Sequence, residues 1–153
     1  MQRTFVMVKP DGVGRGLVGR VMARLEDRGL RLAGLRLLEV TPELAARHYA
    51  AHRDKPFYPG LVRFITSGPV VAMAWEGEDA VMVVRTMMGP TDPRQAPPGT
   101  IRGDFALTID CNLIHGSDSP EAAEAEIALY FSPDQLVSRP RPEESWIYPP
   151  TSR

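Results

Sequence analysis

The sequence NLIHGSDSP, residues 112–120, brings an imidazole, a carboxamide, hydroxyls and a carboxylate together in one short segment. A helix is predicted to begin at its end, because Ser119 is a favoured N-cap and Pro120 is tolerated at the first helical position. Gly116 lacks a side chain, so a bulky group could approach the face of His115. A simple turn would not need His115 or Asp118, although an isolated histidine is more often buried and satisfied by one hydrogen bond.

The helix that follows is predicted to carry a carboxylate on its apolar side. At about 100° per residue, one face gathers Ala122, Ala123, Ile127, Leu129 and Tyr130. Glu121 and Glu124 fall on the other side, whereas Glu126 falls within the apolar face. An inward carboxylate is costly unless it is paired, and an N–H of His115 would be a suitable partner that holds the ring in one tautomer. The alternative is that Glu126 binds another group or reaches around to solvent.

Three cationic residues add a second indication of the chemistry. Lys9 follows the apolar run of residues 5–8 and could point from a strand end into a cleft, although a surface lysine is also common there. Arg85 and Arg102 flank a proline-rich loop, residues 89–100. The forked donors of arginine match phosphate oxygens. A histidine, a lysine and arginines around one cleft therefore suggest phosphate chemistry, although a surface arginine is usually only solvated.

Length and composition are typical of one globular domain, which we expect to span residues 1–153 with a proline-rich tail at about 139–153. The net charge of −1 leaves no bulk electrostatic footprint for nucleic acid or membrane, and no segment approaches transmembrane length. The lone Cys111 excludes an intrachain disulfide, and the first residues lack a signal-peptide pattern. A cytoplasmic protein that binds neither membrane nor nucleic acid is expected.

The predicted elements alternate along the chain. Strands are expected at residues 3–8, 30–40, 70–75 and near 105–109, and helices at 17–28, from 41, at about 61–67, at 79–88 and at 120–131. Residues 9–16 are expected to form a glycine-bearing turn, which is not a P-loop because the Gly-Lys-Ser/Thr ending is missing. The tail is expected to be irregular. This order fits an α+β ferredoxin-like sandwich, in which a four-stranded antiparallel sheet has helices packed on one face.

Six motifs in this order resemble the nucleoside diphosphate kinase family. They are Lys9–Gly12, His48-Tyr49, Lys55–Tyr58, Ser67–Met73, Gly99–Phe105 and Asn112–Asp118. The resemblance runs from Arg3 to Tyr148 and implies the same ferredoxin-like fold. It also implies transfer of the γ-phosphoryl group from ATP or another nucleoside triphosphate to a nucleoside diphosphate.

The resemblance assigns roles to individual residues. It implies a ping-pong route in which His115 attacks and becomes phosphohistidine, while Glu126 holds the ring through the nitrogen that does not attack. Phosphates would be bound by Lys9, Arg85, Thr91 and Arg102. The remaining nucleotide contacts would come from Asn112 at the sugar, Phe57 stacking on the base, Ile109 beside the base, and Tyr49 and Ser117 near the phosphoryl group and the ring.

Magnesium is expected to bridge the phosphate oxygens. The sequence contains no compact carboxylate cage, so no side-chain metal ligand is assigned and the nucleotide is expected to bring most of the coordination of Mg²⁺. The role of Asp118 stays open between stabilising the turn and a catalytic or metal-linked function.

Departures from the family pattern lie beside the site and in the tail. Asp110-Cys111 stands where relatives often have a small residue and an arginine. The tail residues Trp146-Ile147-Tyr148 resemble those of hexamer-forming members, and apolar side chains on a proline-rich tail usually need a partner surface. A homohexamer is expected, with a tetramer as the alternative, unless the tail folds onto its own subunit.

Three other functions remain as alternatives. In a phosphohistidine phosphatase, water would take the phosphoryl group. A ferredoxin-like sheet with exposed aromatics could bind RNA, although the net charge argues against it. The chain could also be an inactive structural member of the family, although all the matching catalytic positions are present.

Overall fold

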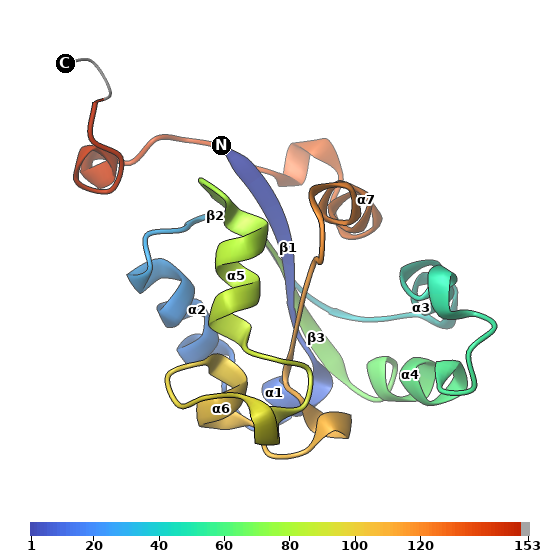
Figure 1. Ribbon diagram of the computed structural model, residues 1–153. Helices are drawn as coiled ribbons and strands as arrows, with labels where there is room; N and C mark the ends of the chain where they lie inside the picture. The colour runs from blue at the N-terminus through green and yellow to red at the C-terminus, as the bar shows by residue number, and fades with distance from the viewer. Residues whose placement is uncertain (151–153) are drawn as a thin grey trace.

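A four-stranded antiparallel sheet forms the centre of the computed structural model, which describes residues 1–150 (Figure 1). The strand order is β2-β3-β1-β4, with bounds Gln2–Val8 for β1, Arg31–Glu39 for β2, Pro69–Gly77 for β3 and Ile114–Gly116 for β4. In the β1–β4 pair, His115 lies opposite Met7 and Ile114 lies opposite Val8. The predicted α+β class and antiparallel sheet are confirmed.

Helices cover both faces of this sheet, so the expectation of helices on one face is wrong. On one face, α2 (Val18–Asp27) and α5 (Ala80–Met88) pack over Val6 and Val8. On the other, α3 (Pro42–His48), α4 (Tyr58–Ile65) and α7 (Pro120–Tyr130) pack over Phe5 and Met7, as Figure 1 shows. The reason is visible in β1, where residues 5–8 are all apolar and fully buried instead of alternating.

The structure contains two short α-helices that the sequence did not predict. Residues 10–14 form α1 (Pro10–Gly14) within the expected glycine-bearing turn. The strand expected near 105–109 is absent, because α6 (Ile101–Phe105) includes its first residue and the 3₁₀ helix Ile109–Cys111 includes its last. Helix α6 begins after Thr100, whose Oγ1 accepts the N–H of Gly103 at 3.0 Å. The apolar pair Ile101 and Phe105 has i,i+4 spacing and packs on the core as one helical face. The fourth strand is β4, which contains His115.

The helix ends mostly agree with the sequence. The Oγ of Ser119 accepts the N–H of Ala122 at 3.0 Å and starts α7 as predicted, and Gly29 has a φ of 102° after α2. Asp79 precedes α5, but its side chain makes no cap. The helix α4 begins at Tyr58, before the predicted Leu61. The short 3₁₀ helices are Ala50–His52, Pro93–Gln95, Ile109–Cys111, Pro133–Gln135 and Pro142–Trp146.

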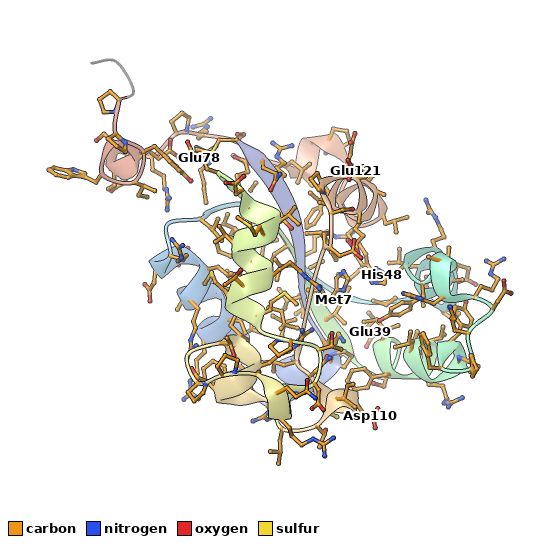
Figure 2. All side chains as sticks on the ribbon, viewed as in Figure 1. Met7, Glu39, His48, Glu78, Asp110 and Glu121 are labelled. Atoms are coloured by element: carbon orange, nitrogen blue, oxygen red, sulfur yellow. The ribbon has the colours of Figure 1, made fainter. Side chains whose placement is uncertain are left out.

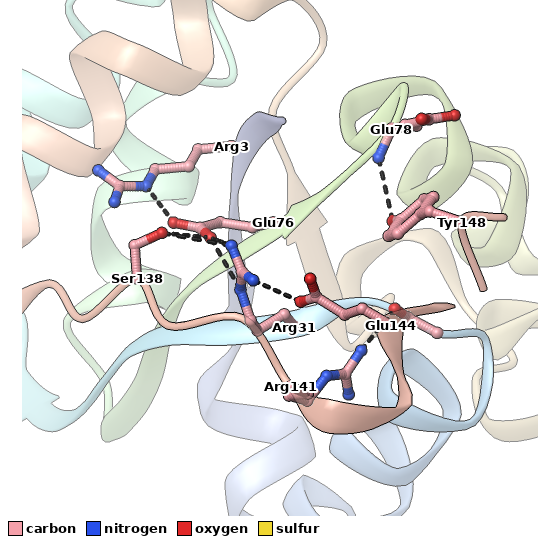
Figure 3. Close-up of polar contacts among 9 residues, drawn as sticks. Arg3, Arg31, Glu76, Glu78, Ser138, Arg141, Glu144 and Tyr148 are labelled. Carbon is pink, nitrogen blue, oxygen red and sulfur yellow. Dashed lines mark hydrogen bonds and ion pairs between the residues drawn. The ribbon is translucent and has the colours of Figure 1, made fainter. Parts of the chain in front are cut away.

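The tail lies along its own subunit and is partly regular, since Pro142–Trp146 form a 3₁₀ helix where irregular chain was expected. Figure 3 shows its anchor, the buried Glu76, which pairs with Arg3 and Arg31. Burial alone would raise the pKa of Glu76, but its hydrogen bonds outweigh burial and lower it. Arg31 also pairs with Glu144 of the tail. The carboxylate of Glu76 therefore links the sheet to the tail.

No helix among residues 1–150 combines the length and the apolar character needed to cross a bilayer.

Replacing Gly103 with alanine is expected to lower the free energy of unfolding by about 1–3 kcal/mol, the usual range for overpacked sites. A Cβ at Gly103 would lie 2.1 Å from the carbonyl oxygen of Pro97, and a backbone atom cannot rotate away as a side chain can. Gly14→Ala is the control, because a Cβ there meets no atom within 4 Å. Urea unfolding of both variants is the measurement, and equal stabilities would contradict this account of α6.

Candidate active site

His115 is held by a carboxylate from the neighbouring helix. Strand β4 carries His115, and α7 carries Glu126, whose Oε1 lies 2.6 Å from Nε2 of the ring. The hydroxyl of Ser117 donates to Oε2 of the same carboxylate. Burial would raise the pKa of Glu126, but the hydrogen bond and charge of His115 and the hydrogen bond of Ser117 lower it. The predicted His115–Glu126 pair is present, and Nδ1 is the ring nitrogen that Glu126 does not engage.

A second histidine, whose role the sequence reasoning missed, lies against the first. The rings of His48 and His115 are 4.9 Å apart and nearly perpendicular. Figure 2 shows His48 between α3 and α7, where its Nδ1 is 3.2 Å from the hydroxyl of Tyr130. Burial, with a further contribution from His115, lowers the pKa of His48 to about 3, so this ring is neutral. The sequence had placed His48 in one of the six family motifs without assigning it a role.

A cavity of about 450 Å³ opens beside this pair of rings. His115 and Glu126 line it together with Arg85, Tyr49 and Asp118. Arg85 is exposed and donates to the carbonyl of Gly116 at 3.3 Å. Burial, with a contribution from Glu126, raises the pKa of Tyr49 to about 12, so its hydroxyl keeps its proton. This cavity therefore offers a free imidazole nitrogen beside a guanidinium and a hydroxyl.

Five of the other predicted residues line a second cavity of about 780 Å³. Its walls include two half-exposed apolar side chains, Phe57 (53%) and Ile109 (47%). Lys9, Thr91 and Asn112 form the polar side, where Nζ of Lys9 donates to Oδ1 of Asn112 at 2.8 Å and the amide of Asn112 donates to the carbonyl of Thr91 at 3.1 Å. The apolar side suits a flat ring, and the polar side suits hydroxyls and phosphates.

Arg102 lies apart from both cavity linings and is buried. Its guanidinium donates to three backbone carbonyls, those of Asn112 at 3.2 Å, Gly89 at 3.0 Å and Ile114 at 2.7 Å. Burial, with a contribution from Arg85, lowers the pKa of Arg102 to about 10, so it remains charged at neutral pH. In this structure Arg102 joins the proline-rich loop to the His115 segment, a role that its spacing in the sequence did not indicate.

The turn before β4 depends on residues that the sequence reasoning did not select. Leu113 has a φ of 76°, which is unfavourable for a branched side chain. Its N–H is bound by Oδ2 of Asp11 at 3.0 Å, and its carbonyl accepts the N–H of Lys9 at 2.9 Å. Asp11 therefore fixes the chain between Asn112 and His115. The motif Lys9–Gly12 contained this signal, but the partner lies 102 positions away.

Gly116 serves packing in addition to lining the cavity beside His115. A Cβ at Gly116 would lie 2.5 Å from Sδ of Met88. The missing side chain therefore lets α5 pack closely on β4.

Metal-binding groups within residues 1–150 gather at one place, where His48, His115 and Glu126 present ligand atoms within 4.8 Å of one another. This set is rich in nitrogen, whereas Mg²⁺ prefers oxygen ligands. Asp118 is an exposed carboxylate on the cavity wall beside His115. The residues present suit a magnesium ion that arrives with its own oxygen ligands.

Comparison with known proteins identifies the family. The family model described as nucleoside diphosphate kinase matches residues 2–136. The chain belongs to the nucleoside diphosphate kinase family. It transfers a phosphoryl group from a nucleoside triphosphate to a nucleoside diphosphate, and members of the family generally use Mg²⁺-nucleotides. The predicted family and reaction are confirmed.

Individual relatives support this assignment over most of the chain. The nucleoside diphosphate kinase of Thermus thermophilus is 64% identical over 137 residues, which cover 90% of this chain and 100% of that protein. That of Archaeoglobus fulgidus is 57% identical, with 97% and 98% covered. The solved structure of the Halobacterium salinarum enzyme in complex with CDP is 56% identical and superposes with a TM-score of 0.94, covering 96% of this chain and 98% of that one.

The kcat/KM for a nucleoside diphosphate is expected to fall as pH rises through about 8. Burial, with a contribution from Arg102, lowers the pKa of Lys9 to about 8, so the free enzyme loses this positive charge there. The pH dependence of kcat/KM reports groups of the free enzyme, and an uncharged Lys9 binds phosphate less well. Lys9→Arg keeps its charge and should shift the fall to higher pH. Identical profiles for the two enzymes would show that another group is responsible.

Proposed function

We propose that this enzyme works by a ping-pong route through phosphohistidine on His115, and that the contact of Glu126 with Nε2 carries this assignment. A carboxylate that accepts a hydrogen bond from Nε2–H favours the tautomer in which Nδ1 carries the lone pair. That nitrogen would attack the γ-phosphorus of the donor, and the bond to the β–γ bridging oxygen would break. The diphosphate leaves with that electron pair. The second half-reaction reverses these steps with a different diphosphate, so one site serves both nucleotides.

The two cavities suggest how the nucleotide lies. We assign the base to the gap between Phe57 and Ile109, where stacking would accept any base. Asn112 and Lys9 would contact the sugar, and the phosphates would extend past Thr91 toward Arg85 and His115. Arg102 would act on the phosphates chiefly by its charge, because three of its donors already bind backbone carbonyls. Tyr49 and Ser117 would keep the phosphoryl group and the ring in place.

Magnesium would be held mainly by the phosphate oxygens, with Asp118 as the protein carboxylate able to reach its water ligands. When bound, Mg²⁺ neutralises phosphate charge and orients the reacting group. Glu126 is not assigned to it, because the ligand atoms gathered around this carboxylate are imidazole nitrogens, which Mg²⁺ avoids.

A homohexamer in the cytoplasm remains our prediction for the assembly and its location, with residues 1–153 forming one domain. Part of the tail packs on its own subunit, because the hydroxyl of Tyr148 accepts the N–H of Glu78 at 3.2 Å. Trp146 is 90% exposed, however, and Leu37 on the edge strand β2 is 70% exposed. Such side chains favour contact with other subunits. The lone Cys111 supports a reducing compartment.

The wild-type enzyme is expected to become labelled by γ-labelled ATP and Mg²⁺, with label that is stable in alkali and passes to GDP. His115→Ala should lose this label, whereas the control His52→Ala should keep it, because His52 is exposed on its 3₁₀ helix and lies outside the group formed by His48, His115 and Glu126. Label lost to water without an acceptor would instead indicate the phosphatase. Label retained in folded His115→Ala would exclude His115 as the nucleophile.

Light scattering is expected to give the mass of six chains for the wild type. Trp146→Ser should shift the mass toward smaller species if the exposed indole contacts another subunit, whereas the exposed Met82→Ser lies outside the tail and serves as a control. A tetrameric wild-type mass would refute the hexamer.

A further inference from the structure

Three side chains from three elements meet at one end of the smaller cavity. His48 comes from α3, His115 from β4 and Glu126 from α7, and their ligand atoms all lie within 4.8 Å of one another. All three line the cavity of about 450 Å³. We propose that they form a Zn²⁺ site, and that the bound ion blocks phosphoryl transfer by occupying His115.

The ligand set is one that zinc takes and magnesium avoids. Two imidazoles and one carboxylate, with a fourth position left for water, are typical of open zinc sites, whereas Mg²⁺ prefers oxygen alone. Metal–ligand distances of about 2.0–2.2 Å would draw the three ligand atoms somewhat closer together than they lie now. Side-chain rotation can supply this movement, because all three side chains are only partly buried. The cavity provides the entry path and the open position.

The surroundings prepare His48 as a ligand. Its ring lies 4.9 Å from that of His115, at an angle of 69°, so the two imidazoles meet beside the Glu126 carboxylate. One ring nitrogen contacts the hydroxyl of Tyr130, which can fix the tautomer as outer partners do in known metal sites. Tyr49 packs edge-on against the same ring at 4.7 Å. The mechanism proposed above makes no other use of His48.

Inhibition by zinc rests on the proposed function of His115 as the nucleophile, whereas the binding of zinc does not. A lone pair of His115 that is shared with Zn²⁺ cannot attack phosphorus, so the ion would act as a reversible inhibitor that a chelator removes. A phosphoryl group on Nδ1 leaves His115 with only Nε2 for the ion and adds bulk beside it, so phosphorylated enzyme should bind zinc less tightly.

Co²⁺ is the spectroscopic probe and isothermal titration with Zn²⁺ is the second measurement, both on unphosphorylated full-length enzyme in excess Mg²⁺. The expected results are d–d absorption of four-coordinate Co²⁺, its displacement by Zn²⁺, and at least a tenfold weaker affinity for His48→Asn. His52→Asn, which removes an imidazole outside the three-ligand set, is the control and should bind as the wild type does. Equal binding by folded His48→Asn, or no binding by the wild type, overturns the site.

Proton NMR of the wild type keeps the proposal testable if His48→Asn does not fold. The chain has three histidines, and Zn²⁺ should shift the ring resonances of His48 and His115 but not those of His52. Unchanged His48 resonances at saturating Zn²⁺ overturn the proposal. Turnover assays then separate the two claims. If His115 is labelled but no metal binds, the zinc site is wrong and the proposed function stands. If zinc binds at these residues without inhibiting turnover, His115 is not the nucleophile.

Discussion

The burial of β1 on both faces is the constraint on which the rest of the structure depends. Residues 5–8 are inaccessible to solvent, so each face of this central strand needs an apolar cover. Helix α7 supplies Ile127 and Tyr130 to the Phe5 face, and α5 supplies Val84 and Met88 to the Val6 face. An unpaired charge would be costly among these buried residues. The functional polar residues therefore collect where β1 ends, at Lys9 and Asp11, and on the short strand that pairs with it.

Glu126 connects this packing to the chemistry. Helix α7 must cover the Phe5 face, yet it carries a carboxylate on the side that faces the sheet. Its burial is tolerated because His115 and Ser117 both hydrogen-bond to it, and removing one partner would leave a buried charge undercompensated. The pair also selects the tautomer of His115. One interaction thus allows the helix to pack and orients the ring of His115.

The sequence predicted those features that depend on the position of a residue within one helix or strand. Glu126 was found because a carboxylate at an apolar helical position needs a partner, and Lys9 because it ends a buried strand. The strand near 105–109 was wrong because Ile101 and Phe105 are apolar with helical spacing, and Thr100 caps that helix. The expectation of helices on one face was wrong because residues 5–8 are apolar on both sides of the strand. The second face of the sheet therefore also needs a cover of helices.

Contacts between distant segments could not be predicted in this way. Asp11 matters because it binds the N–H of Leu113, and Arg102 because it binds carbonyls on both sides of the loop. His48 looked like one more helical residue until its ring was placed beside His115. Gly116 was assigned to ligand approach, but the side chain that its missing Cβ accommodates, Met88, belongs to α5. Each of these roles depends on a partner that only the tertiary fold supplies.

Burial and neighbouring positive charges lower the pKa values of two cations, Lys9 and Arg102. The pKa of Lys9 is lowered by burial and by the charge of Arg102, and the pKa of Arg102 is lowered by burial and by Arg85. The positive charges of Lys9 and Arg102 are thus less favourable in the free enzyme than they would be in water. A nucleotide phosphate relieves this repulsion by adding opposite charge among them. Because the fold already holds these charges together, they would need little rearrangement to stabilise the charge that develops during transfer. A bound phosphate would also raise the pKa of Lys9 and so favour its charged form.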